Sequence, residues 1–227
     1  MSPAPTDLPD HGGGALAASD QDLLARAYAL ESDAASRALY RDWARSYDHT
    51  MLQGLQYQSP RLVAALFAHA LPDKAAAVVD VGCGTGLVGR ALAELGYRCI
   101  DGLDISPEML AVARASGAYR QLLGVDLTAP LPLADGIYDG AVCAGTFTSG
   151  HIGAGCLREL LRILKPGAAF AFTVKMAVWE SMGFAQTLQA LQATGTVEAL
   201  ERQAGALYAN SAEPDGWFCL LHKRRKV

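Results

Sequence analysis

Short apolar runs alternate with longer amphipathic stretches from residue 77 to the end of the chain, and this pattern defines the expected fold. The apolar runs have the length and the β-branched content of buried strands, whereas the longer stretches show helical periodicity. We predict strands over 77–82, 99–104, 120–125, 139–145, 168–174, 196–202 and 217–224, and helices over 86–95, 107–116, 154–164 and 178–193. The stretch from Thr196 to Gln203 fits a helix as well as a strand.

Local signals mark several helix ends. Ser-Pro pairs at Ser59-Pro60 and Ser106-Pro107 are expected to start helices, because serine is a good N-cap and proline fits the first turn. Gly96 and Gly117 are expected to end helices. Alternation of strands and helices implies a mostly parallel sheet with helices on both faces, an α/β fold of the doubly wound, Rossmann-like type. Ligands of such folds bind at the carboxyl ends of the strands.

The chain is expected to form one domain behind a short leader. Residues 1–18 are rich in proline, glycine, alanine and serine, which is typical of a flexible segment. A length of 227 residues suffices for one substantial hydrophobic core but not for two. We therefore expect a single domain over 19–227, with an N-terminal helical cap over 19–75 and an α/β core over 76–227.

A glycine-rich turn over Asp80–Gly86, with the sequence DVGCGTG, joins the first predicted strand to its helix. Alternate glycines let the backbone turn sharply and approach a ligand closely, and the first amides of the helix favour a negative group on it. A nucleotide-like cofactor is the expected ligand. Gly84, Gly86 and Gly89 also match the G-x-G-x-x-G pattern of dinucleotide binding, so a nicotinamide cofactor is an alternative.

Three aspartates stand where predicted strands end. Asp80 lies inside the strand end just before the glycines, where a carboxylate would repel a pyrophosphate but attract an amino group. This position favours a cofactor with an amino-acid-like part. Asp104 ends the second strand and is placed to accept hydrogen bonds from ribose hydroxyls, and Asp126 ends the third. Ordinary capping or turn roles are the alternative for Asp80 and Asp126.

Further motifs follow at residues 103–110 (LDISPEML), 124–127 (GVDL), 138–152 (YDGAVCAGTFTSGHI) and 157–174 (LRELLRILKPGAAFAFTV). Together with the glycine loop, their order and spacing resemble those of the class I S-adenosylmethionine-dependent methyltransferases. The runs over 40–48 and 57–62 are similar to those of small methyltransferase-like proteins of the Williams-Beuren type. The sheet of this family carries one antiparallel strand near the C-terminus, a place that suits 217–224.

The resemblance implies that S-adenosylmethionine is the cofactor. The residues expected to bind it are Tyr40, Trp43, Asp80, Gly82, Cys83, Gly84, Gly86, Asp104, Ile105, Asp126 and Leu127. By match to the family's motifs, the glycine loop would line the methionine part and Asp104 would hold the ribose. Ile105 would pack on the adenine, and Asp126 with Leu127 would lie near the adenine edge.

Aromatic residues before the first strand are candidates for a lid. Tyr40, Trp43 and Tyr47 recur at helical spacing and share one face. Helices at this place often cover the cofactor in the family, so we expect the segment to close over the ligand, with Tyr47 as a candidate catalytic residue. The alternative is an ordinary packing stripe.

His151 is the candidate general base. It lies in the loop after the strand predicted over 139–145, which the resemblance places beside the transferring methyl group. Histidine titrates near neutrality and can accept a proton from an acceptor. The alternative is a structural or solvated histidine, because methyl transfer from a sulfonium mainly requires orientation and exclusion of water. The other histidines form no ligand-spaced pair, so no metal site is expected.

Composition narrows the partners and the compartment. The net charge of -4 argues against a broad phosphate-binding surface, and we expect no nucleic-acid partner. No apolar stretch is long enough to span a bilayer and no signal-peptide pattern precedes the cap, so we expect no membrane partner. Five cysteines without C-x-x-C spacing indicate reduced thiols in a cytoplasmic protein.

The sequence is therefore interpreted as an S-adenosylmethionine-dependent methyltransferase that acts on an oxygen, nitrogen, sulfur or carbon atom of a small-molecule acceptor. A protein side-chain methyltransferase and a cofactor-binding homologue without catalysis are alternatives, and a nicotinamide-dependent oxidoreductase is a third. The sequence leaves the acceptor and the oligomeric state open.

Overall fold

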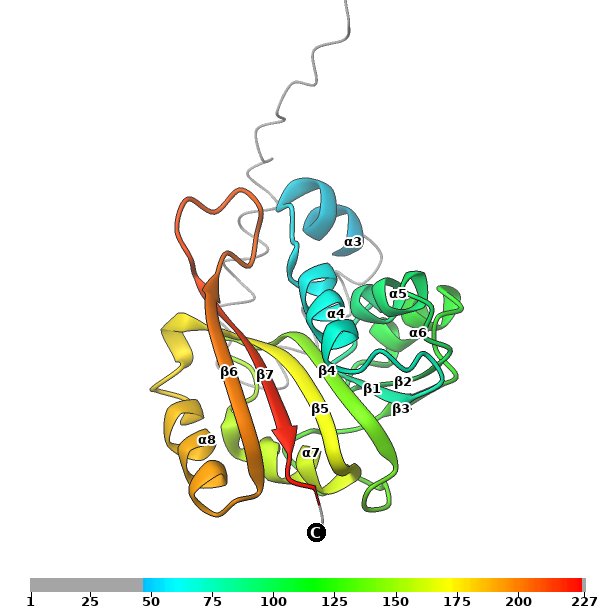
Figure 1. The fold of residues 1–227 in the computed structure, drawn as a ribbon. Helices are drawn as coiled ribbons and strands as arrows, with labels where there is room; N and C mark the ends of the chain where they lie inside the picture. Colours follow the sequence, from blue (N-terminus) through cyan, green and yellow to red (C-terminus); the bar gives the residue numbers. More distant parts are fainter. Residues whose placement is uncertain (1–46, 226–227) are drawn as a thin grey trace, which may run out of the picture.

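A computed structural model describes residues 47–225, which contain one seven-stranded sheet (Figure 1). The strands are β1 (Ala77–Val81), β2 (Cys99–Asp104), β3 (Gln121–Gly124), β4 (Tyr138–Phe147), β5 (Leu164–Lys175), β6 (Val197–Gly205) and β7 (Gly216–Lys223). Their order is β3-β2-β1-β4-β5-β7-β6, and only β7 runs antiparallel to its neighbours. The predicted Rossmann-like fold, with one antiparallel strand near the C-terminus, is confirmed.

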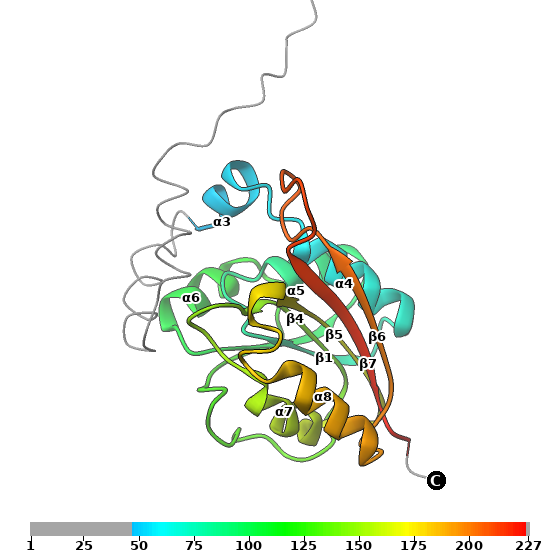
Figure 2. The same cartoon turned by 90° about the vertical axis from the view of Figure 1, so that its left-hand side faces the viewer.

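Helices cover both faces of the sheet. They are α4 (Ser59–Ala70), α5 (Leu87–Glu94) and α6 (Pro107–Ala115) on one face, and α7 (Leu157–Ile163) and α8 (Phe184–Ala193) on the other (Figure 2). The single turn η2 (Ala154–Cys156) precedes α7, and the single turn η3 (Met176–Val178) follows β5. The helix expected over 178–193 begins only at Phe184, after Gly183 with φ 77°.

The period-two alternation of β5 shows how one strand serves two cores. Phe170 and Phe172 pack with α7 and α8, whereas Ala169 and Ala171 pack with α4 and α5. All of these side chains are buried, so the strand is a continuous apolar run rather than an alternating one. The segment predicted ambiguously over 196–202 is the strand β6, because it pairs along its length with β7.

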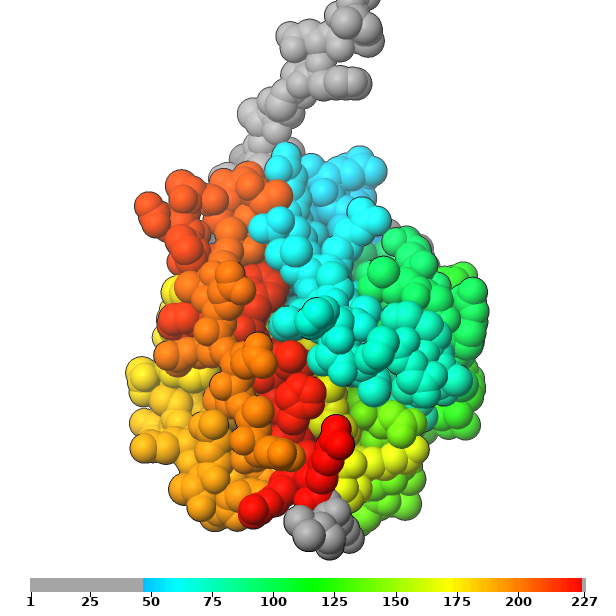
Figure 3. All heavy atoms as spheres, viewed as in Figure 1, coloured from blue at the N-terminus to red at the C-terminus, as the bar shows by residue number. Residues whose placement is uncertain are grey.

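A short helical segment comes before α4. It comprises α3 (Tyr47–His49) and the π-helical turn η1 (Thr50–Gly54), and it packs against the loop between β6 and β7 (Figure 3). Met51 and Leu55 form a separate apolar cluster with Leu207 and Tyr208 of that loop. The sequence segments 47–58 and 205–208 therefore form one structure at the end of the sheet.

The N-terminal end of α4 differs from the prediction. Gln58 is the N-cap and makes no side-chain capping bond, while Ser59 lies inside the helix. Ser59 is fully buried, and its hydroxyl donates to the Leu207 carbonyl oxygen at 3.0 Å instead of capping the helix. In contrast, Ser106 caps α6 as predicted, because its Oγ accepts the Met109 amide at 3.2 Å.

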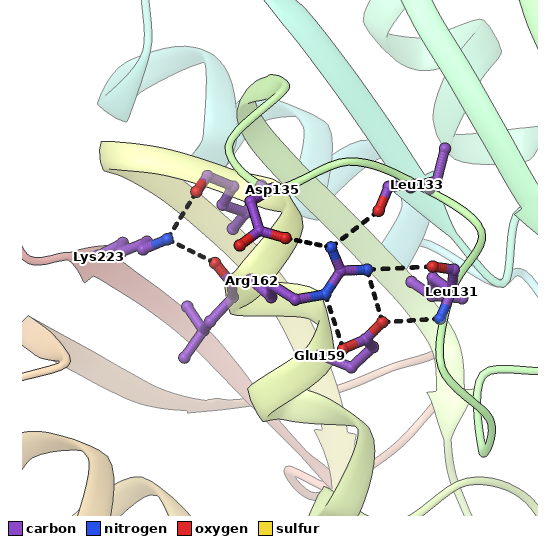
Figure 4. Close-up of polar contacts among 8 residues, drawn as sticks. Leu131, Leu133, Asp135, Glu159, Arg162 and Lys223 are labelled. Carbon is purple, nitrogen blue, oxygen red and sulfur yellow. Dashed lines mark hydrogen bonds and ion pairs between the residues drawn. The ribbon is translucent and has the colours of Figure 1, made fainter.

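The connection from β3 to β4 contains no helix and is held by Arg162 of α7 (Figure 4). The guanidinium donates to the carbonyl oxygens of Leu131 and Leu133 at 3.1 and 2.8 Å. It also pairs with Glu159 at 2.7 Å and Asp135 at 2.5 Å. Glu159 in turn accepts a hydrogen bond from the Leu131 amide at 2.7 Å. Side chains of α7 therefore both donate hydrogen bonds to the β3–β4 connection and accept one from it.

The predicted leader over 1–18, the first part of the cap, and the residues Tyr40 and Trp43 lie outside the described residues. Within 47–225, no helix has the length and apolar character needed to cross a bilayer.

Candidate active site

A cavity of about 890 Å³, counted with its open mouth, lies at the carboxyl ends of the central strands. The segments after β1, β2, β3 and β4 all contribute to its wall, and α3 covers one side. The predicted site residues that line it are Tyr47, Gly82, Gly84, Asp104, Ile105, Asp126, Leu127 and His151. The chain therefore brings six of the eleven predicted cofactor residues and the predicted base into one cavity, as expected for the carboxyl edge of a parallel sheet.

The three glycines of the loop have left-handed backbones but different surroundings. Their φ angles are 65° at Gly82, 53° at Gly84 and 94° at Gly86. A Cβ on Gly82 would lie 2.0 Å from Thr146 Oγ1, and one on Gly86 would lie 2.9 Å from the Tyr119 ring. A Cβ on Gly84 would meet nothing within 4 Å, so this residue faces the open cavity. Gly86 is thus placed against a side chain rather than in the cavity.

Asp104 connects the glycine loop to α6. Its Oδ2 accepts the Gly84 amide at 2.8 Å, and its Oδ1 accepts the Ser106 amide at 2.9 Å. Burial raises the pKa of the Asp104 carboxyl, an effect opposed by these amides and by the ring of His151. The carboxylate therefore fixes the loop and also contributes to the cavity wall.

Apolar side chains form the wall beyond Asp104. Ile105, Met109, Val125 and Leu127 line this part of the cavity, which suits a flat apolar ring. Asp126 also lines it, and its Oδ1 accepts from the Thr128 amide at 2.8 Å and from the Thr128 hydroxyl at 2.6 Å. Asp126 therefore combines the turn role given as an alternative with a place in the cavity wall.

Asp80 and Cys83 lie beneath the loop and do not line the cavity. Asp80 is fully buried and accepts the Tyr119 hydroxyl at 2.6 Å. Its Oδ1 has no hydrogen-bond partner within the described part of the chain. Burial raises the pKa of the Cys83 thiol well above its usual range, so this thiol is neutral.

His151 lines the cavity and is held in one orientation. Its Nδ1 lies 2.9 Å from the Ser149 carbonyl oxygen and 2.9 Å from Thr148 Oγ1. A carbonyl oxygen can only accept, so the neutral ring carries its proton on Nδ1 and its lone pair on Nε2. This is the tautomer that a general base requires.

Asp48 fastens the segment before α4 to the glycine loop. Its two carboxylate oxygens accept from Thr85 Oγ1 at 2.5 Å and from Arg90 Nη2 of α5 at 2.6 Å. Tyr47, the neighbouring residue, lines the cavity. Asp48, Thr85, Arg90 and Tyr119 were not predicted as site residues, because each acts through a partner that is distant in the sequence.

The Asp48 contacts lead to a prediction about the lid. Asp48→Asn removes the charge from the contact with Arg90, which is about two-thirds buried, and should speed amide exchange over 47–54 by about fivefold, equivalent to about 1 kcal/mol. Hydrogen exchange measured with S-adenosylhomocysteine bound tests this. Glu94→Gln, which removes an exposed ion pair with Arg61 on the outer side of α5, is the matched control. Equal exchange in the variant and the wild type would show that Asp48 does not hold the segment.

Comparison with known proteins agrees with the geometry. Residues 79–172 match the model of the methyltransferase domain family. Methyltransferase-like protein 27 of Homo sapiens is 35% identical over 142 residues, which are 60% of this chain and 56% of that protein. A malonyl-acyl-carrier-protein O-methyltransferase of Pseudescherichia vulneris is 35% identical over 131 residues, which are 57% of this chain and 49% of that protein. The chain thus spans about half the length of these curated relatives.

Solved structures share the fold. A Methanococcus maripaludis protein proposed to be an S-adenosylmethionine-dependent methyltransferase superposes with a TM-score of 0.62, at 18% identity, over 82% of this chain and 94% of that one. The complex of DhpI with SAH gives a TM-score of 0.58 at 18% identity, over 83% and 95% of the two chains.

One expectation is wrong. The predicted partners were a small molecule and no nucleic acid, yet two relatives are 18S rRNA (guanine-N7)-methyltransferases. Those of Arabidopsis thaliana and Saccharomyces cerevisiae are 45% and 37% identical over 65 residues, or 29% of this chain. The low net charge misled the prediction, because an enzyme can bind RNA through a local surface or a partner protein without a basic chain overall.

The predicted resemblance is confirmed, and its Williams-Beuren part agrees with the similarity to the human relative. Residues 79–172 are therefore similar to the methyltransferase domain family, and this similarity, together with the shared fold, supports methyl transfer with S-adenosylmethionine as the cofactor.

Proposed function

We propose that the chain transfers the methyl group of S-adenosylmethionine to a nucleophilic atom of a small-molecule acceptor. The observation that carries this proposal is the shared cavity: the glycine loop and the carboxylates of the cofactor side face the same space as His151 and the end of β4. An acceptor entering beside His151 would therefore lie next to the cofactor.

The residues present fit the cofactor. Gly84 leaves the loop open to the cavity, and Asp104 provides a carboxylate for ribose hydroxyls. Ile105 and Leu127 supply apolar surface for an adenine ring. Beneath the loop, the Oδ1 of Asp80 is a buried acceptor without a protein partner in the described residues, as expected below a ligand that carries an ammonium group. When bound, the sulfonium supplies an electrophilic methyl group.

The protein's own residues would orient the acceptor, exclude water and accept a proton. Tyr47 lines the same cavity, and its hydroxyl would position a polar acceptor. Nε2 of His151 would take the proton of an acceptor hydroxyl or amine as the new bond forms. Asp48 would keep α3 closed over the cavity, which limits entry of water.

The small-molecule part of the proposal is supported by the partly apolar cavity and by relatives named as O-methyltransferases of malonyl-acyl-carrier protein and of ubiquinone biosynthesis. RNA and protein acceptors are the rival outcomes.

The five free thiols of the chain are consistent with a cytoplasmic location, which is part of the same proposal and is tested by cell fractionation.

The experiment uses methyl-labelled S-adenosylmethionine with the purified protein and three separate acceptor pools: metabolites, total RNA and proteins. We expect label in the metabolite pool, on a compound that gains the mass of one methylene unit. Label in the RNA pool or the protein pool alone would overturn the small-molecule acceptor but not the methyltransferase activity. Binding of S-adenosylhomocysteine without label in any pool would favour a homologue that binds the cofactor without catalysis.

A further inference from the structure

Tyr119 lies in the connection between α6 and β3. Its ring packs against three glycines beneath the cofactor loop. A Cβ on Gly89 of α5 would lie 2.2 Å from its ring, and Cβ atoms on Gly86 and Gly102 would lie 2.9 and 3.0 Å from it. No side chain larger than hydrogen fits at Gly86 or Gly89 while the ring is in place, whereas at Gly102 the nearest atoms belong to Leu122 and Cys83, at 2.6 and 2.9 Å. The second half of the G-x-G-x-x-G pattern therefore accommodates a tyrosine ring of this chain.

The Tyr119 hydroxyl ends at the most deeply buried acid of the site. It donates to Asp80 Oδ2 at 2.6 Å, and Oδ1 has no hydrogen-bond partner in the described residues. A buried carboxylate oxygen without a partner is costly, so a ligand group that compensates it is expected. The cofactor carries an ammonium group on its methionine part, and a positive charge above the loop would satisfy this requirement.

We propose that Tyr119 is a positioning residue of the cofactor site: its ring supports the glycine loop from below, and its hydroxyl holds the Asp80 carboxylate as the electrostatic partner of the cofactor's ammonium group. This inference rests on the proposed function, because Asp80 has that partner only when S-adenosylmethionine occupies the loop. Charges interact strongly here because Asp80 is fully buried.

The titratable groups around Asp80 determine the sign of the pH dependence. The pKa of Asp80 is raised to about 7, mainly by burial. Asp104 adds to this increase, and the hydrogen bond from Tyr119 opposes it. Burial raises the pKa values of Cys83, Tyr119 and Cys143, so these groups are neutral near pH 7. Only ionised Asp80 attracts an ammonium group, so affinity for the cofactor should fall as the pH drops below about 7.

Tyr119→Phe separates the two roles, because it keeps the ring between the glycines and removes the hydroxyl. Calorimetry at several pH values, with S-adenosylhomocysteine and with adenosine, is the test. We expect binding of S-adenosylhomocysteine to weaken by about tenfold near neutral pH, with the inflection moved to higher pH, while adenosine binding is unchanged. Adenosine lacks the amino-acid part and serves as the internal reference.

Tyr138→Phe is the matched control. It also removes a tyrosine-to-aspartate hydrogen bond, from Tyr138 to Asp101 at 3.0 Å, but at the amino end of β4, away from the cavity. Asp101 keeps its bonds from Arg120, so the variant should fold and should bind both ligands as the wild type does.

Asp80→Asn is the second variant, and a folded Asp80→Asn with wild-type affinity and pH profile would overturn the inference without Tyr119→Phe. It should weaken binding of S-adenosylhomocysteine and abolish the inflection near pH 7, and adding Tyr119→Phe to it should cost no further affinity. A folded Tyr119→Phe with wild-type affinity and pH profile would overturn the inference, as would equal losses for both ligands. If the wild type does not bind S-adenosylhomocysteine at all, the proposed function itself fails.

Discussion

Replacing His151 by alanine should lower turnover by roughly 100-fold or more, while affinity for S-adenosylhomocysteine stays nearly constant. The Ser149 carbonyl oxygen fixes the Nδ1–H tautomer, so Nε2 is the proton acceptor in the neutral ring. His151 lines the cavity from the loop after β4, in the same cavity as Asp104. Steady-state kinetics with the acceptor identified by labelling, together with calorimetry for the cofactor product, measure both quantities.

The pH profile distinguishes a base from a residue that only shapes the cavity. Wild-type turnover should decline toward acidic pH, because a protonated imidazole cannot accept a proton, and the alanine variant should lose this limb. His69→Ala, which changes an exposed histidine of α4, should leave the rate and the profile unaltered. Near-normal turnover of His151→Ala would remove the residue from the mechanism and leave orientation as the main contribution.

Asp104→Ala should weaken binding of S-adenosylhomocysteine by about 1–3 kcal/mol, which is roughly fivefold to 150-fold in the dissociation constant. The substitution removes the proposed acceptor for ribose hydroxyls and frees the amides of Gly84 and Ser106, which the carboxylate fixes in the wild type. The glycine loop then loses its connection to α6. Calorimetry measures the affinity, and the melting temperature establishes that the variant is folded.

Asp104→Asn provides the matched comparison, because it keeps the size of the side chain and one carbonyl acceptor. It should lie between the alanine variant and the wild type in affinity. Unchanged affinity of a folded alanine variant would show that Asp104 holds the loop without contributing to cofactor binding.

Most elements could be predicted because their signals are local. The observed β2 coincides with the predicted range, and α6 begins at Pro107 behind a serine cap as expected. The segment of β6 was ambiguous because most of its side chains are exposed at the sheet edge, so no buried face imposes a clear period on the sequence. Ser59 failed as a predicted cap because the β6–β7 loop, distant in sequence, covers it.

The site residues also divide into those with local sequence signals and those that depend on partners distant in the sequence. Asp104 ends β2, Ile105 follows it and His151 lies in the loop after β4, and the carboxyl edge of a parallel sheet brings such positions together whatever the rest of the chain does. The contacts of Asp48 with Thr85 and of Tyr119 with Asp80 join residues 37 and 39 positions apart. No local pattern encodes them, because they depend on how α3 and the start of β3 pack on the loop.

Arg162 helps to hold the β3–β4 connection in place. We expect this segment to be the part of the molecule that opens first. The connection spans 125–137 without regular structure, and Arg162 and Glu159 supply side-chain bonds to its backbone at Leu131 and Leu133. Such a segment can detach in a local unfolding event that leaves the sheet intact. Because the Arg162–Asp135 ion pair joins it to α7, salt should favour the detached state, and the cavity wall at Val125 and Leu127 should become labile before the glycine loop does.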